Sequence, residues 1–302
     1  MRPRFTFKFS YMVGAIYAIE MMMEAHLVKT KVKHNIQVFS QELLESYRRE
    51  FSLSSFLWHL RPLIATTQDI MKALNLYYSK EIAPLLYKAI ESYKPHWQKI
   101  LPKIKENTRY LMDFWKKHGN AILNEISNIS RHPWKVEEIK AFIVEPIAEG
   151  HGDAFPREGI ITFEGIKLTT PESIVGFVHE VAHINTLPPF METLEQKDIR
   201  SKVLYEIANE YVAEQALVNI KVLPSLNSPG LQRIFTESVE AWMTESELKF
   251  TYDPEKLKRI VDKWWINHLK SSETLLSSFK KLEKKALPHM KIKRPTRNLR
   301  IK

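Results

Sequence analysis

The stretch TPESIVGFVHEVAHI, residues 170–184, predicts a helix that is enclosed by the rest of the protein. Thr170 suits the N-cap, Pro171 suits the first helical position, and Glu172 complements the positive end of the helix dipole. Apolar residues then occupy nearly every face, which is typical of a buried helix. We expect the helix to end before Pro188-Pro189, because proline cannot continue it.

Three ionisable residues lie in this apolar helix, and their spacing suits a metal ion. His179 and His183 are four residues apart and project from the same face, so both imidazoles can reach one ion. Glu180 lies about 100° around the helix, where its carboxylate can accept a proton from a metal-bound water. Gly176 occupies the same stripe one turn earlier, which favours a close approach by another backbone or a substrate. The competing interpretation is a pair of buried histidines satisfied by hydrogen bonds, but three ionisable groups on an apolar helix need partners.

A catalytic zinc ion needs a third protein ligand and leaves a fourth position for water. The chain has no cysteine, so that ligand is His, Asp or Glu. A second predicted helix, from about residue 196 to 222, has three acids on one largely apolar face: Glu206, Glu210 and Glu214. Carboxylates on such a face need a cation. We expect Glu210, the central acid, to bind the metal, with Glu206 as the alternative; a helix that forms salt bridges with basic neighbours is the competing interpretation.

The segment HEVAH followed by the helical NEYVAE resembles the gluzincin clan of zinc metallopeptidases. The compact unit of residues 134–230, with two short strands and two helices, is most similar to the minigluzincins. This resemblance implies zinc ligands at His179, His183 and Glu210. It also implies that Glu180 is the general base of peptide hydrolysis.

The same resemblance implies roles for the surroundings of the metal. Asn209 or Glu214 would support the ligands, and GIITF (residues 159–163) would be the edge strand along which an extended peptide lies. The chain departs from the family pattern at two points. The interval between the second histidine and Glu210 is longer than in the aminopeptidase and thermolysin branches, and Asn185 stands where the extended motif prefers an apolar residue.

The whole chain predicts a predominantly helical α+β fold. Most of residues 1–133 shows the three-four spacing of helices, with an amphipathic first helix and a helix end at His118-Gly119-Asn120. Residues 141–147 and 159–163 are predicted strands. The polar loop between them contains His151 and Asp153, which we interpret as an ordinary surface turn. The turn NSPG (residues 227–230) precedes further helices that begin at Asp253-Pro254 and near Ser271. The predicted parts are an N-terminal helical domain (1–133), a zincin-like catalytic domain (134–230), a C-terminal helical subdomain (231–286) and a basic tail (287–302).

These features predict an enzyme, a zinc-dependent metallopeptidase with one zinc per chain and a peptide or protein substrate. Tyr252 and His268 are candidates for stabilising the transition state. One alternative is a regulatory or latent metallopeptidase-like protein that cleaves a specific repressor or partner, or only binds it. Another is a helical protein associated with nucleic acid.

Charge and hydropathy bear on partners and location. The net charge is +10, and residues 287–302 contain six basic residues and no acidic one. This tail is solvated, folds back on the cleft, or contacts an acidic partner. The apolar run near the N-terminus stops at Glu20 after nine residues, and no stretch reaches the length of a membrane span. We expect a cytoplasmic protein, which agrees with the absence of cysteine.

Overall fold

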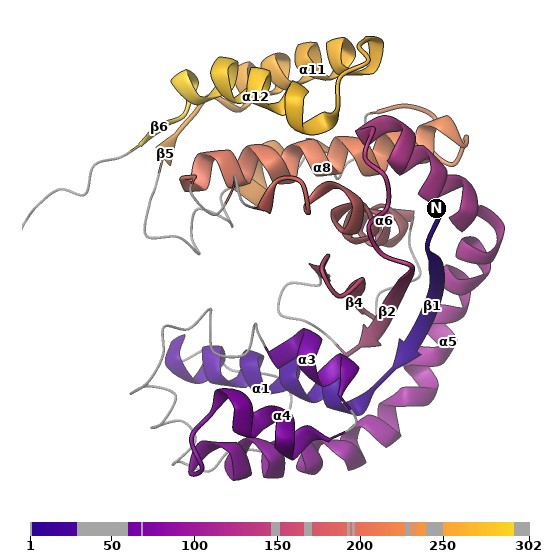
Figure 1. Cartoon of the computed structure of the whole chain (residues 1–302), viewed down its shortest axis with the longest axis vertical. Coiled ribbons are helices and arrows are strands. Elements are labelled where there is room, and N and C mark those ends of the chain that lie inside the picture. Colours follow the sequence, from indigo (N-terminus) through magenta and orange to yellow (C-terminus); the bar gives the residue numbers. More distant parts are fainter. Residues whose placement is uncertain are drawn as a thin grey trace, which may run out of the picture. The chain divides into compact units, whose positions relative to one another are not determined.

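The computed structural model of the chain describes residues 2–28, 60–67, 69–145, 152–165, 171–191, 194, 197–226, 231–232, 234–239 and 250–292 (Figure 1). The chain divides into two compact units. The N-terminal unit comprises Pro3–Gly119 and Val136–Glu180, and the C-terminal unit comprises Met1–Arg2, Asn120–Lys135 and Val181–Lys302. Helices predominate and the sheets are small, so the predicted helical α+β class is confirmed.

A four-stranded sheet forms the centre of the N-terminal unit, in the order β1-β2-β4-β3. Strands β1, β2 and β4 are parallel, whereas β3 is antiparallel to β4 and lies at the edge. The strands are β1 (Arg4–Phe9), β2 (Glu138–Val144), β3 (Asp153–Phe155) and β4 (Ile160–Glu164). The segment GIITF is therefore an inner strand, and the prediction that it is the edge strand is wrong. Likewise, the predicted loop between the two strands contains β3.

An unpredicted strand, β1, precedes the predicted first helix, whose apolar run lies in α1 (Tyr11–Val28). In RFTFKF, aromatic residues alternate with polar ones, which is the period of a half-buried strand. Phe5 and Phe7 face the same side of the sheet and contact Phe177, with ring centroids 5.8 Å apart in both cases. Trp115 covers Phe5 at 4.2 Å. Burial of these rings holds β1 beside β2, although more than a hundred residues separate them in the chain.

In the described chain, four helices follow β1 and precede β2 in sequence: α1 (Tyr11–Val28), α3 (Leu60–Thr66), α4 (Ile70–Tyr77) and α5 (Ile82–Ser130). Helix α3 lies beside α1 and α4 (Figure 1). Helix α5 has 49 residues and continues through His118-Gly119-Asn120, so the helix end predicted there is wrong. Gly119 instead accommodates the indole of Trp115, because a Cβ at this position would lie 2.6 Å from Trp115 Nε1.

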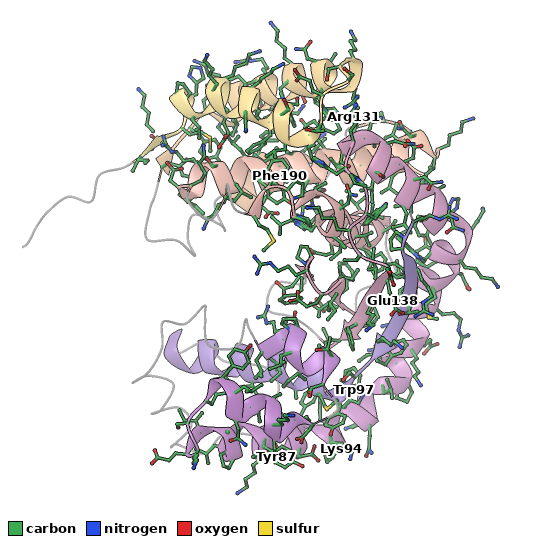
Figure 2. The ribbon with its side chains drawn as sticks, in the orientation of Figure 1. Tyr87, Lys94, Trp97, Arg131, Glu138 and Phe190 are labelled. Atoms are coloured by element: carbon green, nitrogen blue, oxygen red, sulfur yellow. The ribbon has the colours of Figure 1, made fainter. Side chains whose placement is uncertain are left out.

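Helix α5 ends before His132-Pro133, as predicted. Arg131 adopts the left-handed conformation (φ 55°) that terminates helices. Its guanidinium donates to the backbone carbonyls of Ser271 at 2.5 Å and Glu273 at 2.9 Å. Figure 2 labels Arg131 at this junction. The side chain thus ties the end of α5 to the turn between the last two long helices of the C-terminal unit.

The C-terminal unit contains α8 (Ile199–Asn219), a π-helical turn (Ile234–Ser238), β5 (Phe250–Thr251), α11 (Pro254–Lys270), α12 (Leu275–Ala286), a 3-10 turn (Leu287–His289) and β6 (Lys291–Ile292). Helices α11 and α12 lie side by side (Figure 1). Asp253 caps α11 by accepting from the amide of Lys256, which confirms the predicted start, and Thr274 caps α12 in the same way.

The first residues of the predicted basic tail are part of the fold, because β6 pairs with β5 in an antiparallel manner. Residues 293–302 and the predicted turn at 227–230 lie outside the described residues. None of the helices that the structure describes is long and apolar enough to cross a membrane.

Candidate metal centre

Helix α6 (Pro171–Thr186) has the predicted bounds, and its central side chains are enclosed by protein. Phe177, Val178, Val181 and Ala182 have no exposed surface. The division between the two units falls within this continuous helix, after Glu180. The spacing of His179 and His183 is therefore set by helix geometry.

Three side chains on α6 and α8 form a group that can hold a metal ion: His179, His183 and Glu206. One ligand atom from each lies within 4.8 Å of the others. The Nε2 atom of His183 lies 3.2 Å from Oε2 of Glu206. Two ligands of a tetrahedral zinc ion at bonding distances of about 2.0–2.1 Å lie about 3.3 Å apart. The spacing of these two atoms thus fits a shared zinc ion.

The group contains Glu206, the alternative third ligand, and not Glu210. Both residues lie on α8 and are one helical turn apart. The Glu206 side chain is 30% exposed, so this side of the group is accessible to water. Glu210 is buried next along the helix.

A chain of hydrogen bonds orients His183 from its other side. Its Nδ1 atom lies 2.9 Å from the Tyr205 hydroxyl, which in turn lies 2.9 Å from the Thr186 hydroxyl. Thr186 donates to Oδ1 of Asn209 at 2.7 Å. Because Nδ1 is engaged by Tyr205, Nε2 is the nitrogen that faces Glu206. Such outer contacts are usual for metal-binding histidines and restrict the orientation of the ring.

Asn209 therefore supports His183 indirectly, through Thr186 and Tyr205. Tyr205 was not identified from the sequence, because an aromatic residue beside an acid on a helix is most often a core residue. Its ring packs on Phe190, labelled in Figure 2, with centroids 5.0 Å apart. Packing on one side and hydrogen bonding on the other fix the Tyr205 hydroxyl in front of His183.

Asn185 is the polar residue at which the helix departs from the extended motif, and it has a structural role. It is 2% exposed. Its Oδ1 accepts from the Ser130 hydroxyl at 2.6 Å, and its Nδ2 donates to the carbonyl of His132 at 3.0 Å. The amide thus joins the end of α6 to the end of α5.

Glu180, the candidate base, is buried against the loop that leads into β3. A Cβ atom built on Gly152 would lie 2.5 Å from Cγ of Glu180 and 2.6 Å from the carbonyl oxygen of Thr162. Only glycine fits this approach, because both of those atoms would overlap any larger residue. Gly176, predicted to allow such an approach, faces the ring of Phe163 at ordinary contact distance.

The remaining predicted residues lie outside the three-residue group. Glu214 is fully buried on α8. The hydroxyl of Tyr252 donates to the carbonyl of Phe235 at 2.8 Å. His268 is 1% exposed, with Nε2 lying 2.9 Å from the carbonyl of Ile129, and burial lowers its pKa. A role of Tyr252 or His268 in stabilising the transition state stays a prediction. His151 lies outside the described residues.

Comparisons with known proteins identify no relative of this chain. No protein-family model, no curated protein and no solved structure matches the chain.

Proposed function

We propose that this protein is a zinc-dependent metallopeptidase that binds one zinc ion through His179, His183 and Glu206. The observation that carries the proposal is the convergence of these three side chains from two helices, with ligand atoms within 4.8 Å of one another. The donor set of two histidines and one glutamate is that of a catalytic zinc site with an open fourth position. This proposal takes Glu206, rather than Glu210, as the third ligand.

Glu180 is the general base in this proposal. It follows His179 directly in α6, so its carboxylate lies beside the metal-binding face of the helix. When bound, zinc lowers the pKa of a coordinated water and polarises the carbonyl that is attacked. Glu180 removes a proton from the attacking water and delivers it to the departing amine. Its burial shields this transfer from bulk water.

The decisive experiment replaces Glu180 with Gln and measures zinc content and peptide hydrolysis together. Gln retains the volume of the side chain but cannot act as a base, so zinc should remain while the turnover rate falls by about 100-fold or more. His179→Ala should lose both zinc and activity. Glu145→Gln is a matched control, because Glu145 is also buried and bonded to Tyr93 but lies outside the group. It should retain zinc and activity.

Three outcomes separate the alternatives. Activity that survives in Glu180→Gln contradicts the proposal. A wild-type protein that holds zinc but cleaves no peptide in a broad library favours a latent or highly specific enzyme acting on one protein substrate. A folded protein that takes up no zinc removes the metal site. We place the protein in the cytoplasm as part of the same proposal, which measurement of the amount of the protein in each fraction of fractionated cells would check.

A further inference from the structure

A buried polar cluster lies on the sheet face opposite α6. It consists of Tyr17 from α1, Arg61 from α3, Asp153 from β3 and Thr162 from β4. Asp153 and Thr162 are directly paired in the antiparallel ladder, so their side chains share one face. Gly152 precedes Asp153 and points to the other face, where Glu180 lies. All of these residues belong to the N-terminal unit.

Asp153 is held by two partners from the N-terminal helices. The hydroxyl of Tyr17 donates to Oδ2 of Asp153 at 2.6 Å, and Nη1 of Arg61 lies 2.5 Å from the same oxygen. The Arg61 guanidinium also lies over the Tyr17 ring, 4.3 Å from its centre. Tyr17 has one hydroxyl proton and donates it to the carboxylate, so the contacting Thr162 hydroxyl donates to Tyr17.

The cluster is well shielded from water. The side chains of Arg61 and Asp153 are 8% and 19% exposed. Burial, followed by the charge of Asp153, raises the pKa of Tyr17 well above its ordinary value of 10.0, so its hydroxyl stays protonated. An ion pair in such surroundings is strongly coupled, because loss of either partner leaves a buried charge uncompensated.

Strand β3 needs this support. It has three residues and, among the described strands, pairs with β4 alone, and a short edge strand is weakly held by its backbone ladder. Its position determines that of Gly152, and the Gly152 backbone packs directly against the Glu180 side chain. Asp153 in β3 is thus in contact with Tyr17 and Arg61, and the preceding residue Gly152 is in contact with Glu180.

We propose that Tyr17 and Arg61 are positioning residues for Glu180, acting through Asp153 on the edge strand β3. Tyr17, Arg61 and Asp153 form a clamp that fixes β3, so that Gly152 supports the Glu180 carboxylate in the orientation for proton transfer. This gives the N-terminal helices a role in the reaction. The clamp itself follows from the contacts, whereas its effect on Glu180 rests on the proposed function.

Tyr17→Phe tests the clamp, because it removes one hydroxyl and keeps the ring that packs under Arg61. Tyr93→Phe is the matched control. Tyr93 is also a buried tyrosine, and its hydroxyl donates to the Glu145 carboxylate at 2.6 Å, but neither residue belongs to β3. We expect amide hydrogen exchange in peptides covering residues 152–164 to become faster in Tyr17→Phe only. The turnover number of this variant should fall about tenfold or more, with KM and zinc affinity unchanged. Tyr93→Phe should lower thermal stability without either effect.

Gly152→Ala provides a second test that leaves Tyr17 and Arg61 in place. The added methyl group should displace either β3 or Glu180, with the same loss of turnover and the same retention of zinc. Unchanged exchange over residues 152–164 in Tyr17→Phe overturns the clamp. Faster exchange with wild-type turnover overturns the positioning of Glu180. If the wild-type protein neither binds zinc nor cleaves peptides, the proposed function fails, and hydrogen exchange still decides whether the clamp exists.

Discussion

The Nε2 atom of His183 lies 3.2 Å from Oε2 of Glu206, and this pair joins helix α6 to helix α8. In the absence of metal, the two side chains form an ion pair when the histidine is protonated. In the proposed zinc site, the same two atoms would be neighbouring ligands of one ion. Replacement of Glu206 distinguishes a simple ion pair from a shared metal ion, because only in the second case does it remove a metal ligand.

Glu206→Ala should therefore weaken zinc binding by more than about 100-fold, because it removes a proposed direct ligand and outer contacts alone are worth about 10-fold to 100-fold. Glu210→Ala is the matched control, one helical turn further along α8, and should retain zinc affinity within a few-fold. Competition of each purified variant against a zinc-binding dye measures both affinities. A greater loss of zinc affinity in Glu210→Ala would identify Glu210, the residue expected from the sequence, as the third ligand. Equal zinc affinities of the wild type and both variants would mean that Glu206 and His183 form only an ion pair.

Tyr205→Phe should weaken zinc binding by about 10-fold to 100-fold, which is typical of outer contacts to a metal-binding histidine. The variant removes the hydroxyl that engages Nδ1 of His183 and leaves the ring packed on Phe190. The same dye competition measures the change. Wild-type affinity in Tyr205→Phe would mean that packing alone orients His183.

Asn185→Leu should lower the free energy of unfolding by about 1–3 kcal/mol, because Ser130 and the carbonyl of His132 lose a buried partner. Urea denaturation measures this loss. Ser130→Ala combined with Asn185→Leu should cost less than the sum of the single changes, since the two side chains share one hydrogen bond. Strict additivity would show that their contact contributes nothing to stability.

Stability should decrease as the pH falls from about 7 to about 5. Burial lowers the pKa of both His132 and His268 below the ordinary value of 6.5, and the charge of Lys135 lowers the pKa of His132 further. At His268, the charge of Arg131 also lowers the pKa, whereas the hydrogen bond with the Ile129 carbonyl and the charge of Glu273 act in the opposite direction. The unfolded chain therefore takes up protons first. The stability that these histidines contribute is present above about pH 6.5 and is lost below it.

Urea denaturation at several pH values measures this dependence, and His268→Gln should reduce its slope between pH 7 and 5. A wild-type stability that is constant over this interval would contradict the prediction. A His268→Gln variant with the wild-type slope would assign the acid sensitivity to groups other than His268.

Local sequence was sufficient to predict helix α6 and the pairing of His179 with His183. The period of a helix places residues four apart on one face, whatever surrounds it. The start of α11 was predicted for a similar reason, because Asp253 binds an amide three residues away. The strands β2 and β4 were also identified, with bounds shifted by a few residues.

Strand neighbours could not be predicted in this way. RFTFKF alternates as a strand, but its place depends on pairing with residues 138–143, far along the chain. The edge position of β3 likewise depends on a ladder with β4. At Gly119, the sequence suggested a helix end, whereas the neighbouring Trp115 ring explains the glycine within a continuous helix.

The third member of the candidate metal site shows the same limit most clearly. Glu206, Glu210 and Glu214 recur every four residues on α8, so the helix presents all three on one face and the pattern cannot choose among them. Which of the three glutamates faces the histidines depends on the register of α8 relative to α6 along the helix axes. Contacts of Tyr205 with His183 and Thr186, and of Thr186 with Asn209, set that register and bring Glu206 to the histidines. Helix periodicity is local and can be read along the chain, whereas the register between two helices is fixed by side chains that meet only in the folded protein.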